Sequence, residues 1–557
     1  FKAKIKKKTL YVDEKKCNGC GECEIECPVV RMDEFNGELS TKKAIYRLYP
    51  QAIPNVFTIN KTGATAPCRG TCPAGVNVQG YVALIRKRKF AEALELIRER
   101  MPFAGVCGRI CHHPCESNCN LGQSGDPLSV RNLKRFVADY EKQQLDSGIP
   151  PKKAGKDETQ TVQPLREEKV AIVGAGPAGL TCANDLVQKG YQVTIFEASH
   201  KPGGMLRTGI PAYRLPKDYL DHEIKLLLDK GIEIKTNQAL GKNFTLESLK
   251  NQGFQSVFLA VGAQKARQIP LQNSDIPGIY YGIPYLKSVS EGEKPETGKY
   301  IAVIGGGNVA IDVARTALRM QKNASVHLYC LESRDEMPAH EWEIREAEEE
   351  GVHLHPSWGP VKVISHDGRA TGLQLKKCTA VFDKDGKFAP AFDAEKTKSV
   401  ETDTIILAVG QECDLAGINN LVQTQKGLIT TDYLTLETSE KGIFAGGDVV
   451  TGPSSLVEAV AQGHRAAESI DLYINGKELH KNREPVMKVE DYASTPETPE
   501  KISPGRIKMP AASPDKRKSS FIEIEQGFSE EDAVKEAERC LQCGNCAECM
   551  ECVRTCK

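Results

Sequence analysis

The sequence predicts an α/β protein in which two nested domains of parallel strands and helices follow an α-helical, cysteine-rich domain. Three observations predict this fold class. A strand, a glycine-rich turn and a helix follow one another twice, at 170–179 and 301–310; two amphipathic helices cover 76–100; and sixteen of the twenty cysteines fall in three groups near the chain ends. A chain of 557 residues has room for three or four domains, since one core rarely exceeds about 250–300 residues.

The composition excludes several classes of partner. The 74 basic and 74 acidic residues cancel, so the net charge favours neither nucleic acid nor an acidic membrane surface. The chain has no apolar run of about 18 residues, as a membrane span requires, and no signal-peptide pattern. Because it begins at Phe1 and stops at Lys557, one residue past its last cysteine, we expect residues to be missing at both ends.

The first cysteine group has the spacing of an iron–sulfur protein. It is the C-x2-C-x2-C-x3-C-P run of bacterial ferredoxins, in which a tight loop wraps thiolates around a [4Fe–4S] cubane. Disulfides are typical of small secreted scaffolds, and zinc is compatible with two-residue spacings alone. The full run favours iron–sulfur, and therefore a reducing cytoplasm. Its members are Cys17, Cys20, Cys23, Cys27 and the following Pro28.

The last cysteine group repeats this spacing without the proline, after one additional pair. In two-cluster ferredoxins the fourth cysteine of each run binds the other cluster. Cys27 and Cys556 can therefore exchange places if the chain ends meet in space, and the spacing leaves both pairings open. The members of this group are Cys540, Cys543, Cys546, Cys549, Cys552 and Cys556.

The middle cysteine group flanks the two predicted helices, which are broken near Arg88 and Lys89. Its members are Cys68, Cys72, Cys107, Cys111, Cys115 and Cys119. This stretch resembles the N-terminal helical domain of the glutamate synthase small subunit. That domain recurs in dihydropyrimidine dehydrogenase and in the NADPH-binding subunit of electron-bifurcating ferredoxin:NADP transhydrogenases. The resemblance implies two [4Fe–4S] clusters.

Two features of that family pattern are missing here. A C-x2-C pair usually precedes the position of Cys68, and a Glu or Gln ligand usually follows on the next helix. This chain has Lys134 in that helix, and an ammonium cannot ligate iron. The resemblance implies Cys540 and Cys543 as substitutes for the pair, because the segment around them resembles the family's opening, and Cys107 as a substitute for the ligand.

These groups together predict four [4Fe–4S] clusters. We expect the sets Cys17, Cys20, Cys23 and Cys27; Cys72, Cys107, Cys111 and Cys115; Cys68, Cys119, Cys540 and Cys543; and Cys546, Cys549, Cys552 and Cys556. His112 and His113 lie among these ligands and are alternatives to one of them. The other cysteines have no partner at a spacing useful for a redox-active pair: Cys182, Cys330, Cys378 and Cys413.

The first strand–turn–helix pattern is a dinucleotide-binding fingerprint. Gly174, Gly176 and Gly179 permit a tight turn, close approach of backbone to a pyrophosphate, and close helix–strand packing. The second strand ends in Glu197, placed to accept the ribose hydroxyls of a dinucleotide. A glycine pattern alone is weak evidence, and the strand, helix and acid together make it strong.

A second fingerprint begins 131 residues after the first, with Gly305, Gly307, Asn308 and Ala310. One dinucleotide fold inserted in another resembles the two-dinucleotide flavoprotein reductases, which implies FAD in the first fold and NAD(P)H in the second. The same resemblance covers the glycines that end two crossover strands, Gly262 and Gly410, and the motif of Gly447 and Asp448, whose aspartate binds the flavin ribityl chain. The segments that contain Gly204, Met205 and Arg214 resemble the glutamate synthase small-subunit type.

The choice of nicotinamide stays open at this point. Glu332 follows the second strand of the inserted fold, and a carboxylate there suits the free 2′-hydroxyl of NAD and repels a 2′-phosphate. Ser333 and Arg334 come next, and Arg334 is the available phosphate partner, whereas NADPH-using relatives carry several arginines here. The family implies NADPH, and the local chemistry favours NADH.

The predicted domains follow from these motifs. They are a ferredoxin-like segment at 1–50, a helical iron–sulfur domain at 51–140, a linker at 141–168, an FAD domain at 169–295 and 415–478, an NAD(P)H domain at 296–414, an extended linker at 479–530 and a C-terminal iron–sulfur segment at 531–557.

We therefore expect an NAD(P)H oxidoreductase subunit that contains FAD and [4Fe–4S] clusters. It would pass electrons to or from ferredoxin, or other redox subunits of a heteromeric complex, and would need no catalytic side chain, because hydride transfer belongs to the cofactors. Cluster segments at both ends favour an electron-bifurcating transhydrogenase subunit over the glutamate synthase small subunit. Another hypothesis is an electron-transfer scaffold with a vestigial nucleotide site. A self-contained reductase like dihydropyrimidine dehydrogenase would need a further FMN-binding barrel.

Overall fold

The computed structural model describes residues 10–556 except 50, 52, 62–64, 151–164, 419–420, 482 and 484–504. The chain divides into two compact units, each built from separate stretches of sequence. One comprises Phe1–Val162, Asn482–Met509 and Gly527–Lys557, and the other Gln163–Lys481 and Pro510–Gln526. Both chain ends therefore belong to the same unit.

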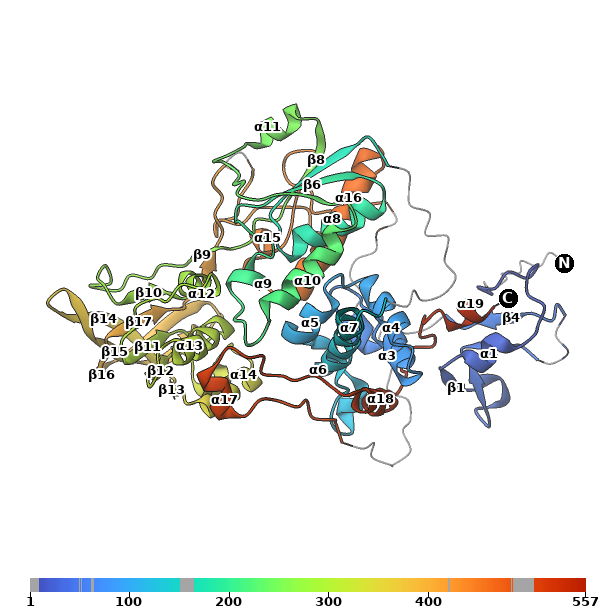
Figure 1. Ribbon diagram of the computed structural model, residues 1–557, viewed down its shortest axis with the longest axis horizontal. Helices are drawn as coiled ribbons and strands as arrows, with labels where there is room; N and C mark the ends of the chain where they lie inside the picture. The colour runs from blue at the N-terminus through green and yellow to red at the C-terminus, as the bar shows by residue number, and fades with distance from the viewer. Residues whose placement is uncertain are drawn as a thin grey trace. The chain divides into compact units, whose positions relative to one another are not determined.

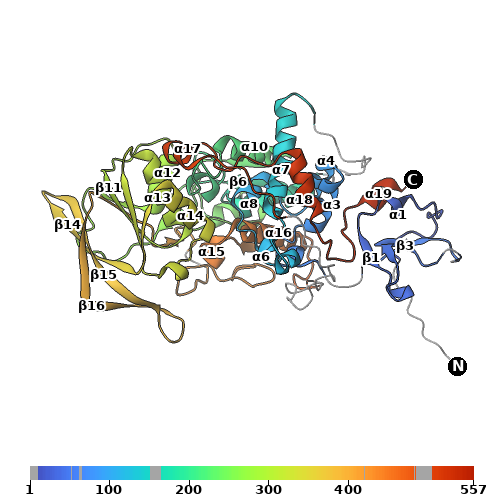
Figure 2. The same cartoon turned by 90° about the horizontal axis from the view of Figure 1, so that it is seen from below.

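The first unit is mainly helical, and its helices come from both ends of the sequence (Figures 1 and 2). The two predicted amphipathic helices are present as α3 and α4, separated where Arg88 takes a left-handed φ of 57°. The C-terminal helix α18 packs against α3. The helices of this unit are α1 (Glu22–Glu26), α2 (Pro67–Gly70), α3 (Val78–Arg86), α4 (Phe90–Arg98), α5 (Ala104–Ile110), α6 (Pro114–Ser117), α7 (Val130–Asp146), α18 (Glu530–Glu538) and α19 (Glu551–Thr555).

Two antiparallel strand pairs follow the first cysteine run. β1 (Val30–Met32) pairs with β2 (Thr41–Lys43), and β3 (Ile45–Arg47) pairs with β4 (Phe57–Ile59). The predicted end of this segment at residue 50 is therefore too early, because β4 completes the hairpin that β3 begins. The helix of the first run, α1, packs against α19 of the last run.

The second unit contains a five-stranded parallel sheet in the order β19-β8-β5-β6-β7. Its strands are β5 (Lys169–Val173), β6 (Gln192–Phe196), β7 (Glu233–Lys235), β8 (Phe254–Leu259) and β19 (Ile443–Ala445). Helices α8 (Pro177–Gln188) and α16 (Leu456–Ile474) pack against each other beside it. Shorter helices follow the strands: α9 (Met205–Thr208), α10 (Lys217–Leu228), α11 (Leu246–Asn251) and α15 (Asp448–Thr451). The strands of a second sheet lie between β8 and β19 in the sequence, and β19 nevertheless pairs with β8 in the first sheet. The predicted nested α/β fold is therefore confirmed.

The inserted sheet has the order β10-β17-β11-β12-β13 and is also parallel. Its strands are β10 (Ile279–Tyr281), β11 (Tyr300–Ile304), β12 (Ser325–Tyr329), β13 (His353–His355) and β17 (Thr404–Leu407). Its helices are α12 (Gly282–Ser290), α13 (Asn308–Met320) and α14 (Glu341–Glu350). The predicted domain boundary at 295/296 is wrong, because β10 pairs with β17 and so belongs to the inserted domain.

Two antiparallel elements complete this unit. A ribbon of β9 (Lys265–Ala266) and β18 (Gln411–Glu412) joins the two domains where the chain crosses between them. A three-stranded sheet of β14 (Trp358–His366), β15 (Arg369–Phe382) and β16 (Phe388–Glu401) packs Leu373 and Leu375 in the same apolar cluster as Ile405 and Leu407 of β17.

Part of the predicted extended linker, 479–530, folds instead onto the inserted domain. Within 510–526, α17 (Pro514–Ser519) packs against α13 and α14, and Arg517 binds Glu349 at 3.0 Å. Ile524 donates a backbone hydrogen bond to the Tyr213 carbonyl at 3.0 Å. The linker predicted at 141–168 also begins later, since α7 continues to Asp146. No helix in the described ranges is long and apolar enough to cross a membrane.

Candidate functional site

The first glycine-rich loop lies between β5 and α8, and each of its three glycines has different surroundings. Gly174 has a φ of 106°, and a Cβ there would lie 2.4 Å from the Ala260 carbonyl oxygen. A Cβ on Gly179 would lie 2.0 Å from the Gly174 oxygen, so this glycine allows the helix to pack on the turn. A Cβ on Gly176 would meet nothing within 4 Å. The open space beside Gly176 is where a dinucleotide pyrophosphate fits against the start of α8.

Glu197 ends β6 and is buried beside this loop. Its carboxylate accepts hydrogen bonds from the backbone nitrogens of Ala175, at 2.7 Å, and Ser199, at 2.8 Å. These bonds fix the carboxylate at the loop, within reach of the ribose that a dinucleotide would place there.

Asp448 begins α15, directly after Gly447, whose φ is 75°. Burial raises the pKa of Asp448 to about 6, although Ser454 donates a backbone hydrogen bond to it at 3.2 Å. The Gly447 nitrogen donates to Gln462 Oε1 at 2.8 Å, which ties the turn to α16. A half-buried carboxylate with so few donors suits the ribityl hydroxyls of FAD.

The motif after β6 lies against the same loop. Gly204 has a φ of 52°, and a Cβ there would lie 3.1 Å from Gly176 Cα, so Gly204 and the following Met205 lie next to the dinucleotide turn. Arg214 is placed differently. Its guanidinium binds Asp312 at 2.6 Å and Glu343 at 2.5 Å, which ties the first domain to α13 and α14 of the inserted one.

The second loop repeats the geometry of the first. Gly305 has a φ of 142°, and a Cβ there would lie 2.3 Å from the Ala408 oxygen. A Cβ on Gly307 would meet nothing within 4 Å. Asn308 starts α13, and its Oδ1 accepts a hydrogen bond from the His340 nitrogen at 2.9 Å. Ala310 stands where the first loop has its third glycine, and it is fully buried.

Glu332, Ser333 and Arg334 follow β12 at the mouth of this loop. Glu332 lies beside it, since a Cβ on Gly306 would be 2.7 Å from Glu332 Oε2. Ser333 caps a short turn with Glu336. Arg334 is bound by Glu341 at 2.8 Å and reaches Glu348 at 3.6 Å. The crossover glycines, Gly262 and Gly410, have positive φ values of 70° and 119° and flank the β9–β18 ribbon.

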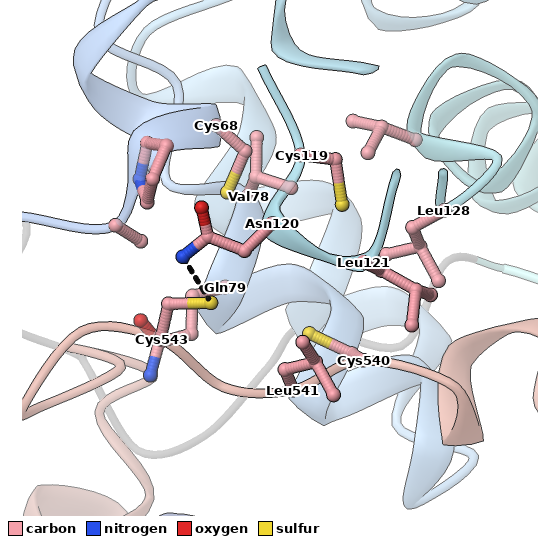
Figure 3. A pocket seen from close by; sticks show the side chains of 13 residues that line it. Cys68, Val78, Gln79, Cys119, Asn120, Leu121, Leu128, Cys540, Leu541 and Cys543 are labelled. Atoms are coloured by element: carbon pink, nitrogen blue, oxygen red, sulfur yellow. Dashed lines mark hydrogen bonds between the residues drawn. The ribbon is translucent and has the colours of Figure 1, made fainter. Parts of the chain in front are cut away.

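Four cysteines from three separate stretches of sequence line one pocket in the first unit. Figure 3 shows the sulfurs of Cys68, Cys119, Cys540 and Cys543 turned toward the space between them. Asn120 Nδ2 donates to Cys543 Sγ at 3.4 Å, the dashed line in the figure. Burial raises the pKa of the Cys540 thiol to about 12, so a bound metal would have to displace its proton.

A second group gathers between α5 and α7. Cys72 lies near Cys111, and Cys115 near both. A hydrogen bond between the Cys107 and Cys111 side chains raises the pKa of Cys107 and lowers that of Cys111. The ring of His113 contacts the carbonyl of Cys111 at 3.1 Å, and its backbone N–H donates to Cys111 Sγ at 3.3 Å.

The last cysteine of each ferredoxin-like run lies beside the thiols of the other run, an arrangement that favours exchange over the expected sets of consecutive cysteines. Cys27 is a charged neighbour of the three thiols that precede Cys556, which are Cys546, Cys549 and Cys552. Cys556 is instead a neighbour of Cys23, together with Cys17 and Cys20. The exchange follows from the packing of α1 against α19, which brings the two chain ends together.

Two buried amides at the start of α3, those of Asn77 and Gln79, hold the C-terminal segment in place. Gln79 Nε2 donates to the Gly544 carbonyl and the Gly544 nitrogen donates to Gln79 Oε1, both at 2.9 Å. Asn77 donates to the Ala547 carbonyl at 2.9 Å. The Glu551 carboxylate, almost fully buried, binds Lys89 at 2.5 Å. Sequence patterns gave no sign of these roles, because each partner is more than 450 residues away.

The donor chemistry fits iron–sulfur clusters. All twenty cysteines are free, so the disulfide alternative is wrong. Within the described ranges, no three His, Cys, Asp or Glu side chains converge closely enough to hold a single metal ion. A cubane needs thiolates at separate corners around a larger space, and soft thiolates are the ligands that Fe–S clusters take.

Comparison with known families agrees with both units. The pyridine nucleotide-disulphide oxidoreductase family model matches residues 168–463. A model of the 4Fe–4S cluster domain II of dihydropyrimidine dehydrogenase matches 62–145, and a 4Fe–4S binding domain matches 10–30.

Relatives match most of the chain. The NADP(+)-dependent formate dehydrogenase subunit beta of Moorella thermoacetica is 38% identical over 524 residues, covering 88% of this chain and 72% of the relative. The NADPH-Fe(3+) oxidoreductase subunit beta of Geobacter sulfurreducens is 34% identical, covering 86% and 75%. The glutamate synthase [NADPH] small chain of Escherichia coli is 30% identical, covering 72% and 87%. The chain therefore belongs to the pyridine nucleotide-disulphide oxidoreductase family and is an FAD-dependent NAD(P)H oxidoreductase with ferredoxin-type iron–sulfur domains.

Proposed function

We propose that this chain is the beta-type subunit of a heteromeric cytoplasmic redox complex, and that it passes electrons between NADPH and a partner subunit through FAD and four [4Fe–4S] clusters. The observation that carries the proposal is the pairing of two dinucleotide loops in one unit with four cysteine groups in the other. Cys182, Cys330, Cys378 and Cys413 provide no disulfide pair for a thiol substrate.

The protein's part in hydride transfer is to bind and position two dinucleotides. Bound FAD accepts two electrons as a hydride and releases them singly, which a nicotinamide cannot do. Gly176 and Gly307 leave open the spaces for the two pyrophosphates. The β9–β18 ribbon and the Arg214 ion pairs hold the two domains in one orientation.

The four proposed ligand sets include all sixteen clustered cysteines. They are Cys17, Cys20, Cys23 and Cys556; Cys27, Cys546, Cys549 and Cys552; Cys68, Cys119, Cys540 and Cys543; and Cys72, Cys107, Cys111 and Cys115. Purified anaerobically, the chain should contain about sixteen iron atoms. A Cys27→Ser variant should remove the EPR signal that Cys549→Ser removes, and leave the signal that Cys17→Ser removes. The opposite pattern would restore the unexchanged sets.

NADPH is proposed as the nicotinamide because the similar beta subunits are named for NADP(+) or NADPH. For a 2′-phosphate to bind, Arg334 must turn from Glu341 and Glu348 toward the nucleotide. An Arg334→Ala variant should bind NADPH roughly 10- to 100-fold more weakly, since a charged hydrogen bond contributes about 1.5–3 kcal/mol, and bind NADH unchanged. Exposed Arg345 on the next helix is the matched control. Equal losses for both nucleotides would contradict the assignment.

The central experiment is an anaerobic titration of the full chain with NADPH and then NADH, recording flavin and cluster absorbance together. Bleaching of the flavin followed by bleaching of the clusters is expected. A bound flavin that neither nucleotide reduces would overturn the proposal in favour of an electron-transfer scaffold. Electron bifurcation stays a prediction: a bifurcating complex would reduce ferredoxin only when a second acceptor is supplied.

A glutamate synthase small subunit is the second candidate. That relative matches 72% of this chain, against 86–88% for the beta subunits, and the additional coverage favours the first candidate. Reconstitution with a glutamate synthase large subunit separates the two, because glutamate formation from NADPH would support the second.

A further inference from the structure

Lys134 is a buried cation at the heart of a proposed cluster site. It lies on α7 and is 4% exposed. Its Nζ is 3.0 Å from Cys107 Sγ, and its other titratable neighbours are Cys111, Tyr81 and Cys115. Among the described residues, Lys134 forms no ion pair with a carboxylate.

Close packing of two helices puts the lysine there. A Cβ on Gly108 would lie 2.6 Å from the Cα of Arg135, so only glycine allows α5 to approach α7 this closely. The carboxylate of Asp139, on the same helix, pairs with two arginines instead of with Lys134: Arg135 at 3.0 Å and Arg109 at 2.9 Å. Cysteine sulfur, and not a carboxylate, is therefore what the Lys134 ammonium contacts, and these sulfurs would become its counter-charge as thiolate ligands of a cluster.

A buried ammonium with no carboxylate partner is strongly unfavourable unless another negative group compensates it. A [4Fe–4S] cluster with four thiolate ligands carries net negative charge, and reduction by one electron makes it more negative. A fixed positive charge beside a ligand thiolate therefore stabilises the reduced form more than the oxidised form.

We propose that Lys134 is a positioning residue that raises the reduction potential of the cluster ligated by Cys72, Cys107, Cys111 and Cys115. Reduction of this cluster would take up one electron, which NADPH would supply through the flavin, and no bond to the protein would form or break. The side chain acts on the cluster through its charge, since an ammonium cannot ligate iron. This inference rests on the proposed cluster assignment.

The test is a potentiometric titration of the full chain, followed by EPR, in three variants. Lys134→Met removes the charge, and Lys134→Arg keeps it. Lys142→Met is the control further along the same helix, where the half-buried Lys142 binds Asp146. The signal of this cluster is identified as the one that Cys72→Ser removes.

We expect Lys134→Met to lower the equilibrium constant for reducing this cluster at least tenfold, or 59 mV for one electron. Lys134→Arg should stay within threefold of the unsubstituted chain, and Lys142→Met should have no effect.

A potential in Lys134→Met equal to that in Lys142→Met would overturn the inference. Loss of the cluster from both Lys134 variants would also overturn it, because size rather than charge would then explain the lysine. Loss from Lys134→Met alone, with an unshifted Lys134→Arg, would support it. Iron analysis separates this from the proposed function, which fails if the unsubstituted chain binds no cluster here.

Discussion

Gly307→Ala should weaken nicotinamide binding while leaving the fold and the flavin intact. Gly307 has a φ of −91° and a ψ of 174°, values that alanine adopts without strain. The added Cβ would meet no protein atom within 4 Å, so the effect on folding should stay below about 1 kcal/mol. The methyl group would instead occupy the space proposed for the pyrophosphate. Overpacking by a methyl group costs about 1–3 kcal/mol, which is roughly a 5- to 150-fold loss of affinity.

The assay is anaerobic stopped-flow reduction of the bound flavin over a range of NADPH concentrations. Thermal unfolding, flavin content and reduction by dithionite should match those of the unsubstituted chain. Gly505→Ala is the control, since a Cβ there also meets nothing within 4 Å and lies far along the sequence from the loop. The same change at Gly176, where a φ of −81° is equally permissive, should lower flavin content instead. Its Cβ would occupy the open space proposed for the FAD pyrophosphate. Unchanged NADPH affinity in Gly307→Ala would refute the placement of the dinucleotide at this loop.

Three further predictions follow from buried polar groups. In flavin-free protein, burial raises the pKa of Asp448 from 3.8 to about 6, so the folded state holds this proton more tightly than the unfolded state does. About 3 kcal/mol of folding stability is therefore present below pH 3.8 and is lost as the pH rises through 6. Asp448→Asn should abolish this loss in denaturant titrations at several pH values. Glu350→Gln should remove the negative charge that Arg315 and Arg319 share, and so destabilise the second unit by about 3–5 kcal/mol. A lower midpoint of unfolding in urea is expected, and an unchanged midpoint would contradict the prediction. Gln79→Leu should leave the Gly544 N–H unpaired, at about 1–3 kcal/mol, while the Gly544 carbonyl keeps the hydrogen bond from Arg31. Faster amide exchange across 540–549 is expected, and exchange no faster than in the exposed Gln143→Leu control would count against it.

Short-range sequence patterns predicted the cofactor-binding features well. Each dinucleotide loop is a local structure, in which a strand, a turn and a helix lie within ten residues, so its glycines are recognisable by spacing alone. The same holds for the α3–α4 break at Arg88 and for the family that the loops indicate. Cysteine spacing likewise indicated iron–sulfur ligands, because the first three thiols of each terminal run lie within one short loop.

Long-range contacts decided what the sequence left open or misjudged. The spacing left the pairing of Cys27 and Cys556 open, because their groups meet only when α1 packs on α19. The inserted domain begins before β10, since a short strand is assigned by its partner β17 rather than by its own pattern. Residues 510–526 read as a polar linker, but α17 docks on α13 and α14.

By itself the sequence therefore determined the nested α/β fold class, the two dinucleotide loops and the set of cysteines that form the cluster groups, because these depend on residues close together in the chain. Only the tertiary structure decided which cysteines stand together, and that Lys134 points its charge at Cys107. Those relations join helices and segments that are distant in sequence, and packing, not local propensity, brings them into contact.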